Sequence, residues 1–99
     1  MFYTYILFSE KLNKFYVGST NNLERRLADH QRGKTRFAKS GKPWRLSYFE
    51  EFESRKEAVR RENYIKKQKS RRFIEELIEA NGLGSAHPGT PGGSLVRVQ

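Results

Sequence analysis

The chain has 99 residues and no cysteine, and its 20 Lys and Arg outnumber its 11 Asp and Glu to give a net charge of +9. A chain of this length builds one small core rather than two. The lack of cysteine excludes disulfides, thiolate zinc sites and cysteine nucleophiles, so any catalytic chemistry must use oxygen and nitrogen groups. The early apolar run Phe2–Phe8 is far shorter than the roughly 20 residues that span a bilayer, and we expect a cytoplasmic protein.

The composition of the chain changes at Asn81-Gly82. Residues 81–99 hold five of the eight glycines, two of the three prolines and a single charged residue, Arg97. Such a segment buries too little apolar surface to offset the entropy lost on ordering. We therefore predict a folded domain over residues 1–80 and a disordered tail over residues 81–99.

The first elements along the chain predict a hairpin. Phe2–Phe8 is aromatic and β-branched, with apolar residues on both parities, which is typical of a central strand covered on both faces. A polar turn over residues 9–13 leads to a second short strand at Lys14–Gly18.

A helix is expected next. Asn21-Asn22, followed by Glu24, is an N-cap signal, and Leu23 and Leu27 mark one apolar face that continues to about residue 32. Gly33 is expected to end this helix.

The remaining elements are a loop, a strand and two helices. Lys34–Pro43 reads as a basic loop, and Trp44–Phe52 as a third strand with Trp44, Leu46 and Tyr48 on one face. Ser54 opens one helix through a Ser-x-x-Glu capping box, and Ser70 caps a last helix with an apolar face over residues 73–78. The expected order is ββαβαα, a small α/β sandwich.

Two tyrosines and a glycine on the predicted hairpin draw attention. Tyr3 and Tyr5 share one side of the first strand, and Tyr16 and Gly18 share one side of the second. Aromatic strand residues usually pack in a core. A glycine at a strand end, however, lets a backbone or a ligand approach closely.

Arg26 and His30 lie one turn apart on the first predicted helix, at the border of its apolar stripe. Arginine can hold a phosphate through two N–H groups, and histidine can exchange a proton near neutral pH. This pairing suits phosphodiester chemistry, and a solvated helix face is the alternative.

Glu62 falls on the apolar stripe of its helix, between Ala58 and Ile65, where a charge is costly unless it is paired or metal-bound. Two interpretations remain open. One is an ion pair with Arg26 or Arg61. The other is one hard cation that keeps several waters, as Mg²⁺ prefers.

The stretch from Arg55 to Arg72 carries nine basic and two acidic residues, a net charge of +7 over eighteen positions. This imbalance predicts a polyanionic partner, and nucleic acid rather than a membrane. Phosphate contacts should dominate over base stacking, because few aromatic residues lie among the basic ones. The residues predicted to contact nucleic acid are Lys34, Arg36, Lys39, Arg61, Lys66, Lys67 and Lys69.

Thr4-Tyr5-Ile6, Tyr16-Val17-Gly18, Arg26, His30 and a helical Glu62 together resemble the GIY-YIG nuclease family. The chain looks like the short, stand-alone, bacterial-type members. Their Tyr-Ile-Leu opening, Asn-Leu-Glu-Arg-Arg-Leu helix start, Pro-Trp-x-Leu strand and Ala-x-x-x-Glu-x-x-Ile-Lys-Lys helix all have counterparts here. The resemblance covers residues 2–78 and implies an α/β (α+β) fold, a small three-stranded antiparallel sheet flanked by helices.

The resemblance implies roles for individual residues: Tyr5 and Tyr16 as the paired tyrosines, Arg26 as the phosphate-binding arginine, His30 at a position that is histidine in several members, Glu62 as the ligand of a single divalent cation, and Gly18 as the point where the backbone approaches the site. The expected cation is Mg²⁺, with Mn²⁺ able to substitute. A free phenol has a pKa of about 10, so a tyrosine base needs nearby cations. The sequence leaves open which tyrosine takes the proton.

The leading hypothesis is a metal-dependent endonuclease that hydrolyses DNA phosphodiester bonds with weak sequence specificity or by recognising DNA structure. Its expected partners are branched, damaged or nonspecific duplex DNA, with RNA left open, and a protein that supplies specificity; binding to DNA would place it at the nucleoid. The alternative is a non-catalytic, basic nucleic-acid-binding module, because an asparagine of larger members has no counterpart over residues 73–78. A subunit of a repair or mobile-element complex is a third possibility.

Overall fold

A three-stranded antiparallel sheet forms the centre of the computed structural model, which describes residues 1–80. Its order is β2 (Lys14–Thr20), β1 (Phe2–Ser9) and β3 (Trp44–Phe52). The strand β1 pairs with both neighbours, so the prediction of a central first strand is confirmed. The predicted disordered tail, residues 81–99, lies outside the described residues.

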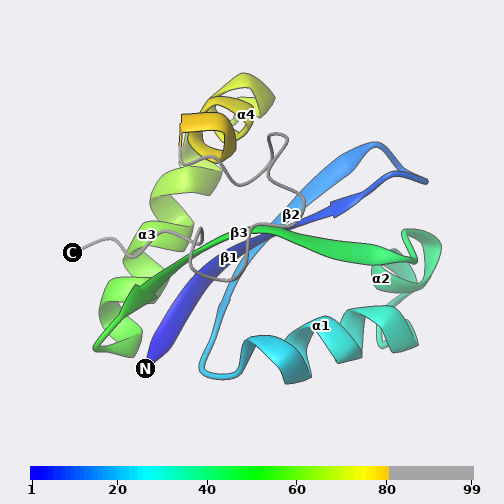
Figure 1. The fold of residues 1–99 in the computed structure, drawn as a ribbon, viewed down its shortest axis with the longest axis horizontal. Helices are drawn as coiled ribbons and strands as arrows, with labels where there is room; N and C mark the ends of the chain where they lie inside the picture. The colour runs from blue at the N-terminus through cyan, green and yellow to red at the C-terminus, as the bar shows by residue number, and fades with distance from the viewer. Residues whose placement is uncertain (81–99) are drawn as a thin grey trace.

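Helices cover both faces of the sheet (Figure 1). They are α1 (Leu23–Arg32), α2 (Arg36–Ser40), α3 (Arg55–Lys67) and α4 (Arg71–Ala80). The three-stranded sheet with flanking helices confirms the predicted α+β fold and the chain order of its main elements.

The short helix α2 corrects the prediction of a loop over residues 34–43. Thr35 caps it by accepting a hydrogen bond from the Ala38 N–H at 3.0 Å, and Ala38 is buried. The Trp44 indole N–H donates to the Ala38 carbonyl at 2.8 Å. Ala38 is the one buried residue of this helix, so the sequence carries no apolar periodicity that could have revealed it.

Each face of the sheet has its own apolar core. On the side of α3 and α4, the buried residues are Ile6, Val17, Tyr48, Ile65 and Ile78. On the side of α1 and α2, they are Tyr5, Leu7 and Trp44, with Tyr16, Leu23 and Leu27 packed against them. Neighbouring residues of β1 thus serve opposite cores, which explains why the strand is apolar on both parities.

A bulge in β3 overturns the prediction that Trp44, Leu46 and Tyr48 share one face. Ile6 pairs with Tyr48 and Leu7 with Leu46, so Ser47 has no partner in the register. The extra residue shifts the alternation by one position. Tyr48 therefore enters the core beneath α3, while Trp44 and Leu46 face the other side.

Polar caps fix where the helices begin and end. Asn22 caps α1 through the Arg25 N–H at 3.0 Å, one residue later than the pattern with Glu24 suggests. Gly33 ends α1 with a left-handed φ of 72°, a conformation that favours glycine. Ser54 and Ser70 cap α3 and α4 as predicted.

A buried polar network attaches α3 to the sheet. Glu50 is fully buried in β3 and accepts from the Arg61 Nε at 2.9 Å (Oε1) and from Nη2 at 3.0 Å (Oε2). The Tyr48 hydroxyl also donates to Glu50, and burial together with this carboxylate raises the Tyr48 pKa. Nearby, the Thr4 hydroxyl donates to the Ala58 carbonyl at 2.7 Å. These bonds set the position of α3 along the sheet.

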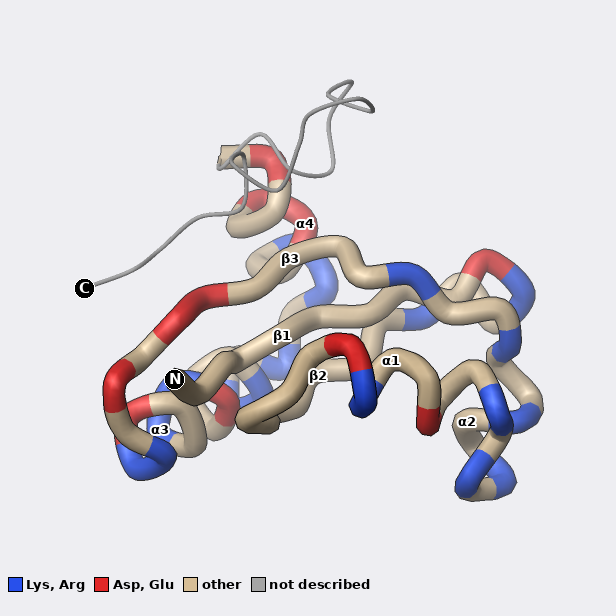
Figure 2. The backbone as a smooth tube through the Cα atoms, turned by 60° about the horizontal axis from the view of Figure 1, so that its bottom comes forward, with Lys and Arg blue, Asp and Glu red and all other residues tan. Residues whose placement is uncertain are grey.

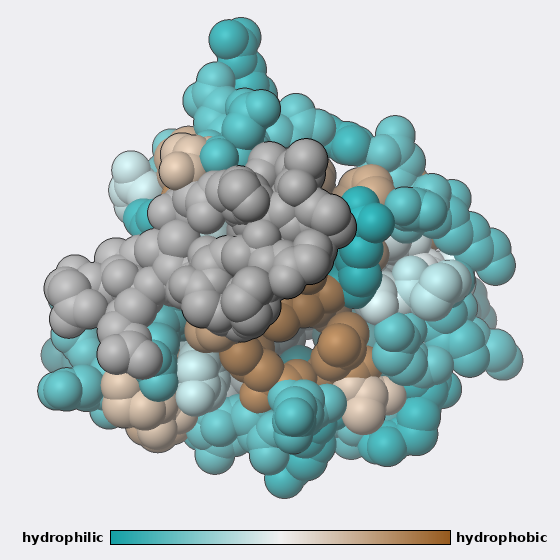
Figure 3. All heavy atoms as spheres, in the orientation of Figure 1, coloured by the Kyte–Doolittle hydropathy of each residue, from teal (hydrophilic) through white to brown (hydrophobic). Residues whose placement is uncertain are grey.

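The surface of the described region is mainly hydrophilic. Figure 3 shows a small apolar area amid hydrophilic side chains on one face. Within residues 1–80, the large hydrophobic residues that stay exposed are Met1, Phe37 and Tyr64. No helix in this region is both long and apolar enough to cross a bilayer.

Candidate active site

Gly18 lies at the point where the two candidate tyrosines, Tyr5 and Tyr16, meet on the α1 side of the sheet. It pairs with Tyr5 across the strands, and Tyr16 lies two positions before it on the same face of β2. A Cβ at position 18 would lie 2.5 Å from the Tyr5 hydroxyl oxygen and 3.2 Å from Tyr16 Cε2. The missing side chain therefore allows the two phenol rings to sit with centroids 6.3 Å apart.

Gly18→Ala should lower the free energy of unfolding by about 1–3 kcal/mol, because the new methyl group overpacks a site that Tyr5 already fills. Tyr5 is 1% exposed and has little room to move. Urea denaturation of the purified variant measures the change. Gly82→Ala, outside the described residues, controls for the substitution itself, and an unchanged midpoint at position 18 would contradict the packing.

The Tyr5 hydroxyl is buried and makes no hydrogen bond of good geometry within residues 1–80. Burial raises the Tyr5 pKa, and nearby Tyr16 and Glu62 add to the rise, while the Arg26 guanidinium opposes it. Tyr5 therefore keeps its proton at neutral pH. An unpartnered buried donor is costly and typical of a site that awaits a ligand atom.

His30 connects α1 to the tyrosine pair. It is 7% exposed, and its ring centroid lies 4.6 Å from that of Tyr16 and 5.4 Å from that of Trp44. The His30 Nδ1 is 3.3 Å from the Arg26 carbonyl oxygen, which can only accept, so this contact places the proton on Nδ1. Burial lowers the His30 pKa, which keeps the ring neutral with Nε2 free to accept.

Arg26 provides the positive charge on this side of the site. Its guanidinium opposes the rise in the Tyr5 pKa, and its side chain is half-buried beside the tyrosines. No carboxylate of the described region forms an ion pair with Arg26. Its charge is therefore available to an anion at this position.

Glu62 reaches the site from α3, on the other face of the sheet. Its Oε1 accepts from the Ser19 hydroxyl at 2.7 Å, and its Oε2 pairs with the Lys66 ammonium at 2.6 Å. The interpretation of an ion pair with Arg26 or Arg61 is therefore wrong, because Glu62 pairs with Lys66, Arg61 binds Glu50, and Arg26 forms no ion pair within residues 1–80. Sequence reasoning missed Ser19; its place directly after Gly18, with its side chain on the α3 face, is the only signal.

The residues present fit one hard cation at Glu62. No group of three or more His, Asp or Glu side chains gathers anywhere in residues 1–80, so a cage built from several protein ligands does not exist there. A single carboxylate that leaves most positions to water suits Mg²⁺. The Lys66 ammonium lies against this carboxylate and would compete with a metal ion for it.

Lys66→Met should raise the affinity of the free protein for Mn²⁺ about 1.4- to 5-fold, since it removes a competing cation from a partly exposed pair worth about 0.2–1 kcal/mol. Titration of Mn²⁺ followed by electron paramagnetic resonance measures the change. Lys67→Met is the matched control, because the neighbouring ammonium does not pair with Glu62. Equal Mn²⁺ affinities of Lys66→Met and the wild type would contradict the assignment of Glu62 as the cation ligand.

The basic residues predicted to bind nucleic acid fall into two groups (Figure 2). Lys34, Arg36 and Lys39 are exposed on and before α2, and Lys66, Lys67 and Lys69 are exposed at the end of α3. Arg61 differs from them. Its guanidinium is engaged by the buried Glu50, which favours a structural role and leaves its nucleic-acid contact a prediction.

Comparisons with known proteins identify the family of this chain. The family profile described as the GIY-YIG catalytic domain matches residues 1–75. The chain belongs to the GIY-YIG family. This is a nuclease family, whose members act on nucleic acids and generally use divalent metal ions. The resemblance stated from the sequence is thus confirmed.

Small bacterial GIY-YIG proteins are among the relatives. The UPF0213 protein CPE1444 of Clostridium perfringens is 46% identical over 68 residues, covering 68% of this chain and 72% of the relative. A UPF0213 protein of Limosilactobacillus reuteri is 40% identical over 85 residues, covering 83% and 86%. The solution NMR structure of the UPF0213 protein BH0048 from Bacillus halodurans aligns with a TM-score of 0.55 at 33% identity, over 97% of this chain and all of that one.

Proposed function

We propose that this domain is a metal-dependent endonuclease that hydrolyses DNA phosphodiester bonds, with weak sequence specificity or recognition of DNA structure. The observation that supports it most directly is the convergence of two phenols, a guanidinium and a carboxylate around the bare backbone of Gly18. Hydrolysis needs an activated water, charge stabilisation at the phosphate and help for the leaving oxygen. The site offers a group for each of these tasks.

In this proposal Arg26 binds the scissile phosphate, because its charge is not used by a carboxylate of the described region. A divalent cation held by Glu62 and waters supplies charge stabilisation at the phosphate and at the leaving 3′ oxygen when bound. Ser19 orients the Glu62 carboxylate through its 2.7 Å hydrogen bond.

Tyr16 is the proton acceptor in this proposal. Tyr5 is the weaker candidate because burial raises its pKa and keeps the hydroxyl protonated. It donates its unpartnered O–H to an oxygen of the substrate or of the attacking water instead. His30 holds the Tyr16 ring in place through a tilted ring contact, and the bond to the Arg26 carbonyl fixes the orientation of the imidazole.

The substrates in this proposal are branched, damaged or nonspecific duplex DNA. The exposed basic groups on α2 and at the end of α3 support phosphate contacts without base readout. A protein partner would supply any strong sequence specificity.

A second candidate is a non-catalytic nucleic-acid-binding module of the same fold. It is favoured by one observation: both Glu62 oxygens are engaged, one by Ser19 and one by Lys66, as in an ordinary structural ion pair. This module would bind DNA with the same basic residues and would not cut it.

One assay separates the two candidates. End-labelled duplex, nicked, flap and single-stranded DNA are incubated with the wild type, Glu62→Gln or Glu76→Gln in Mg²⁺, Mn²⁺ or EDTA. We expect cutting by the wild type and by the Glu76 control, loss in EDTA, and a rate at least about 100-fold lower for Glu62→Gln with binding retained. Glu76 is a suitable control because it is exposed and paired to Arg72 on α4.

Unimpaired cutting by Glu62→Gln would refute the assigned role of this carboxylate. Binding that weakens steeply with salt, without cutting by any of the three proteins, would establish the second candidate instead.

A further inference from the structure

A groove of about 430 Å³ runs between the edge strand β2 and the junction of α3 with α4. It begins beside Glu62, since Lys66 lines it and pairs with that carboxylate. Tyr16 also borders the groove, but its ring packs on the opposite, α1 face of the sheet. Its far end is closed by Arg71, whose guanidinium donates to the Asn13 carbonyl at 2.7 Å and to the Asn13 side-chain oxygen at 2.9 Å. The groove therefore starts beside Glu62 and is of limited length.

The lining of this β2 groove has an apolar floor and a basic rim. The floor is made by four residues: Phe15, Val17, Ile65 and Ile74. The rim is made by four basic residues: Lys14, Lys66, Lys69 and Arg71. No carboxylate lines it, so its charge complements a phosphate, while its floor suits a flat apolar body such as a base.

Two of the rim cations have their charge free within residues 1–80. Lys66 is paired to Glu62 and Arg71 to Glu75, whereas Lys14 and Lys69 are exposed and form no ion pair there. Lys69 has a left-handed φ of 49° in the turn between α3 and α4. This conformation is uncommon for a residue other than glycine, and it fixes the direction in which the Lys69 side chain leaves the backbone.

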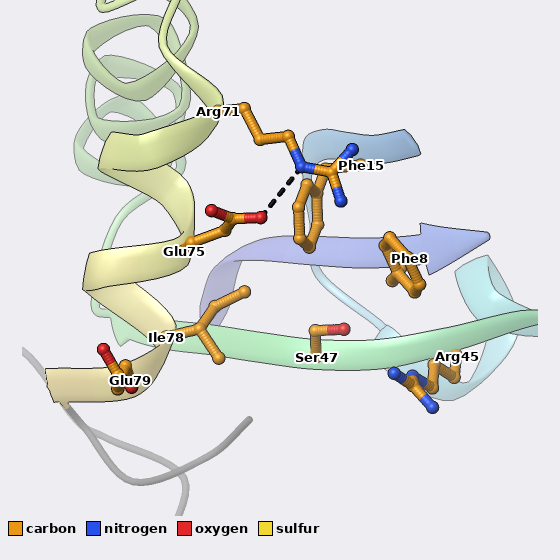
Figure 4. A pocket seen from close by; sticks show the side chains of 8 residues that line it. All are labelled: Phe8, Phe15, Arg45, Ser47, Arg71, Glu75, Ile78 and Glu79. Atoms are coloured by element: carbon orange, nitrogen blue, oxygen red, sulfur yellow. Dashed lines mark hydrogen bonds and ion pairs between the residues drawn. The ribbon is translucent and has the colours of Figure 1, made fainter. Parts of the chain in front are cut away.

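A neighbouring groove lacks this combination. The groove between β3 and α4 is lined by Arg45 and Arg71 but also by Glu75 and Glu79, so its formal charge is zero (Figure 4). The Arg71 guanidinium stacks over Phe15 there, 5.2 Å from the ring centroid, and pairs with Glu75. A phosphate has no net attraction to that groove.

We propose that the β2 groove holds one unpaired nucleotide of a nucleic-acid strand next to the bond that is cleaved. Its phosphate lies against Lys14 and Lys69, and its base lies on the apolar floor. A duplex cannot place a base there without unpairing it, which costs free energy. The domain therefore prefers a substrate with a single-stranded segment beside the cut. This inference rests on the proposed function and adds a substrate class to it.

The test measures binding in EDTA, where no cutting interferes. Fluorescein-labelled 12-mer DNA, as a single strand and as a duplex, is titrated with the full chain at several salt concentrations. A single-stranded RNA of the same sequence shows whether the sugar matters. We expect the wild type to bind both single strands about 10-fold more tightly than the duplex.

Two double variants, each of which removes two positive charges, test whether the β2 groove causes the preference for single strands. Lys14→Gln/Lys69→Gln should abolish it, so that single strand and duplex bind equally. Lys56→Gln/Arg60→Gln removes the same charge from a separate groove on another face of α3. This control should weaken both forms by a similar factor and keep the preference. Urea denaturation checks that both variants remain folded.

The inference is overturned if the wild type binds duplex as tightly as single strands, or if both double variants change the preference equally. Its failure is distinct from failure of the proposed function. Cutting without a single-strand preference removes only the inference, and a preference without cutting removes only the nuclease activity. Absence of binding to every form would remove both.

Discussion

Glu50→Ala is expected to lower the free energy of unfolding by about 3–5 kcal/mol, because it leaves the Arg61 guanidinium without the buried carboxylate that it binds. Glu50 is fully buried and holds both Arg61 and the Tyr48 hydroxyl, so one substitution opens the whole network. Urea denaturation followed by circular dichroism measures the loss.

The matched control is Glu53→Ala, an exposed glutamate just past the end of β3, which should change stability by less than about 0.5 kcal/mol. Glu50→Leu/Arg61→Leu removes both charges together and should recover much of the lost stability. A loss below about 1 kcal/mol for Glu50→Ala would mean that the pair does not anchor α3.

Arg26→Ala is expected to slow DNA cleavage by about 100-fold or more, because it removes the charge that stabilises the phosphate in the transition state. The fold should be retained, since the Arg26 side chain forms no ion pair within residues 1–80. Single-turnover cleavage of end-labelled flap DNA measures the rate, and equilibrium binding measures any loss of affinity.

Arg25→Ala is the control for this variant. Arg25 is exposed on the same turn of α1, and its substitution removes the same charge. It should cleave within about 3-fold of the wild type. Arg26→Lys should lie between the two, since an ammonium keeps the charge and loses the two-point geometry. Cleavage by Arg26→Ala at the rate of Arg25→Ala would exclude the assigned role.

Much of the fold could be predicted from local patterns. The apolar parities of β1 identify it as central, and Gly33, Ser54 and Ser70 mark helix ends that the structure confirms. The bulge at Ser47 could not be predicted, because it depends on the register with β1 and leaves no mark in the alternation. The helix α2 could not be predicted for a similar reason, because its one buried residue, Ala38, creates no apolar periodicity.

The candidate site divides in the same way. The family pattern supplies the candidate residues. The structure brings Tyr5 and Tyr16 together at Gly18, with Arg26 beside them, while Glu62 lies on the α3 side and influences Tyr5 through its charge; their catalytic roles stay predictions. The partners of Glu62 could not be found from the sequence. Ser19 lies 43 residues away and meets the carboxylate only because α3 packs over β2.

The separate cores on the two faces of the sheet affect the fraction of molecules in which the site is complete. Arg26 and His30 belong to the α1 layer, and Glu62 belongs to the α3 layer, so the set is complete only while both layers are docked. Local opening of α3 would withdraw the carboxylate and leave the tyrosines in place. The fraction of molecules ready to act is therefore limited by the less stable layer, and hydrogen exchange along α3 reports it.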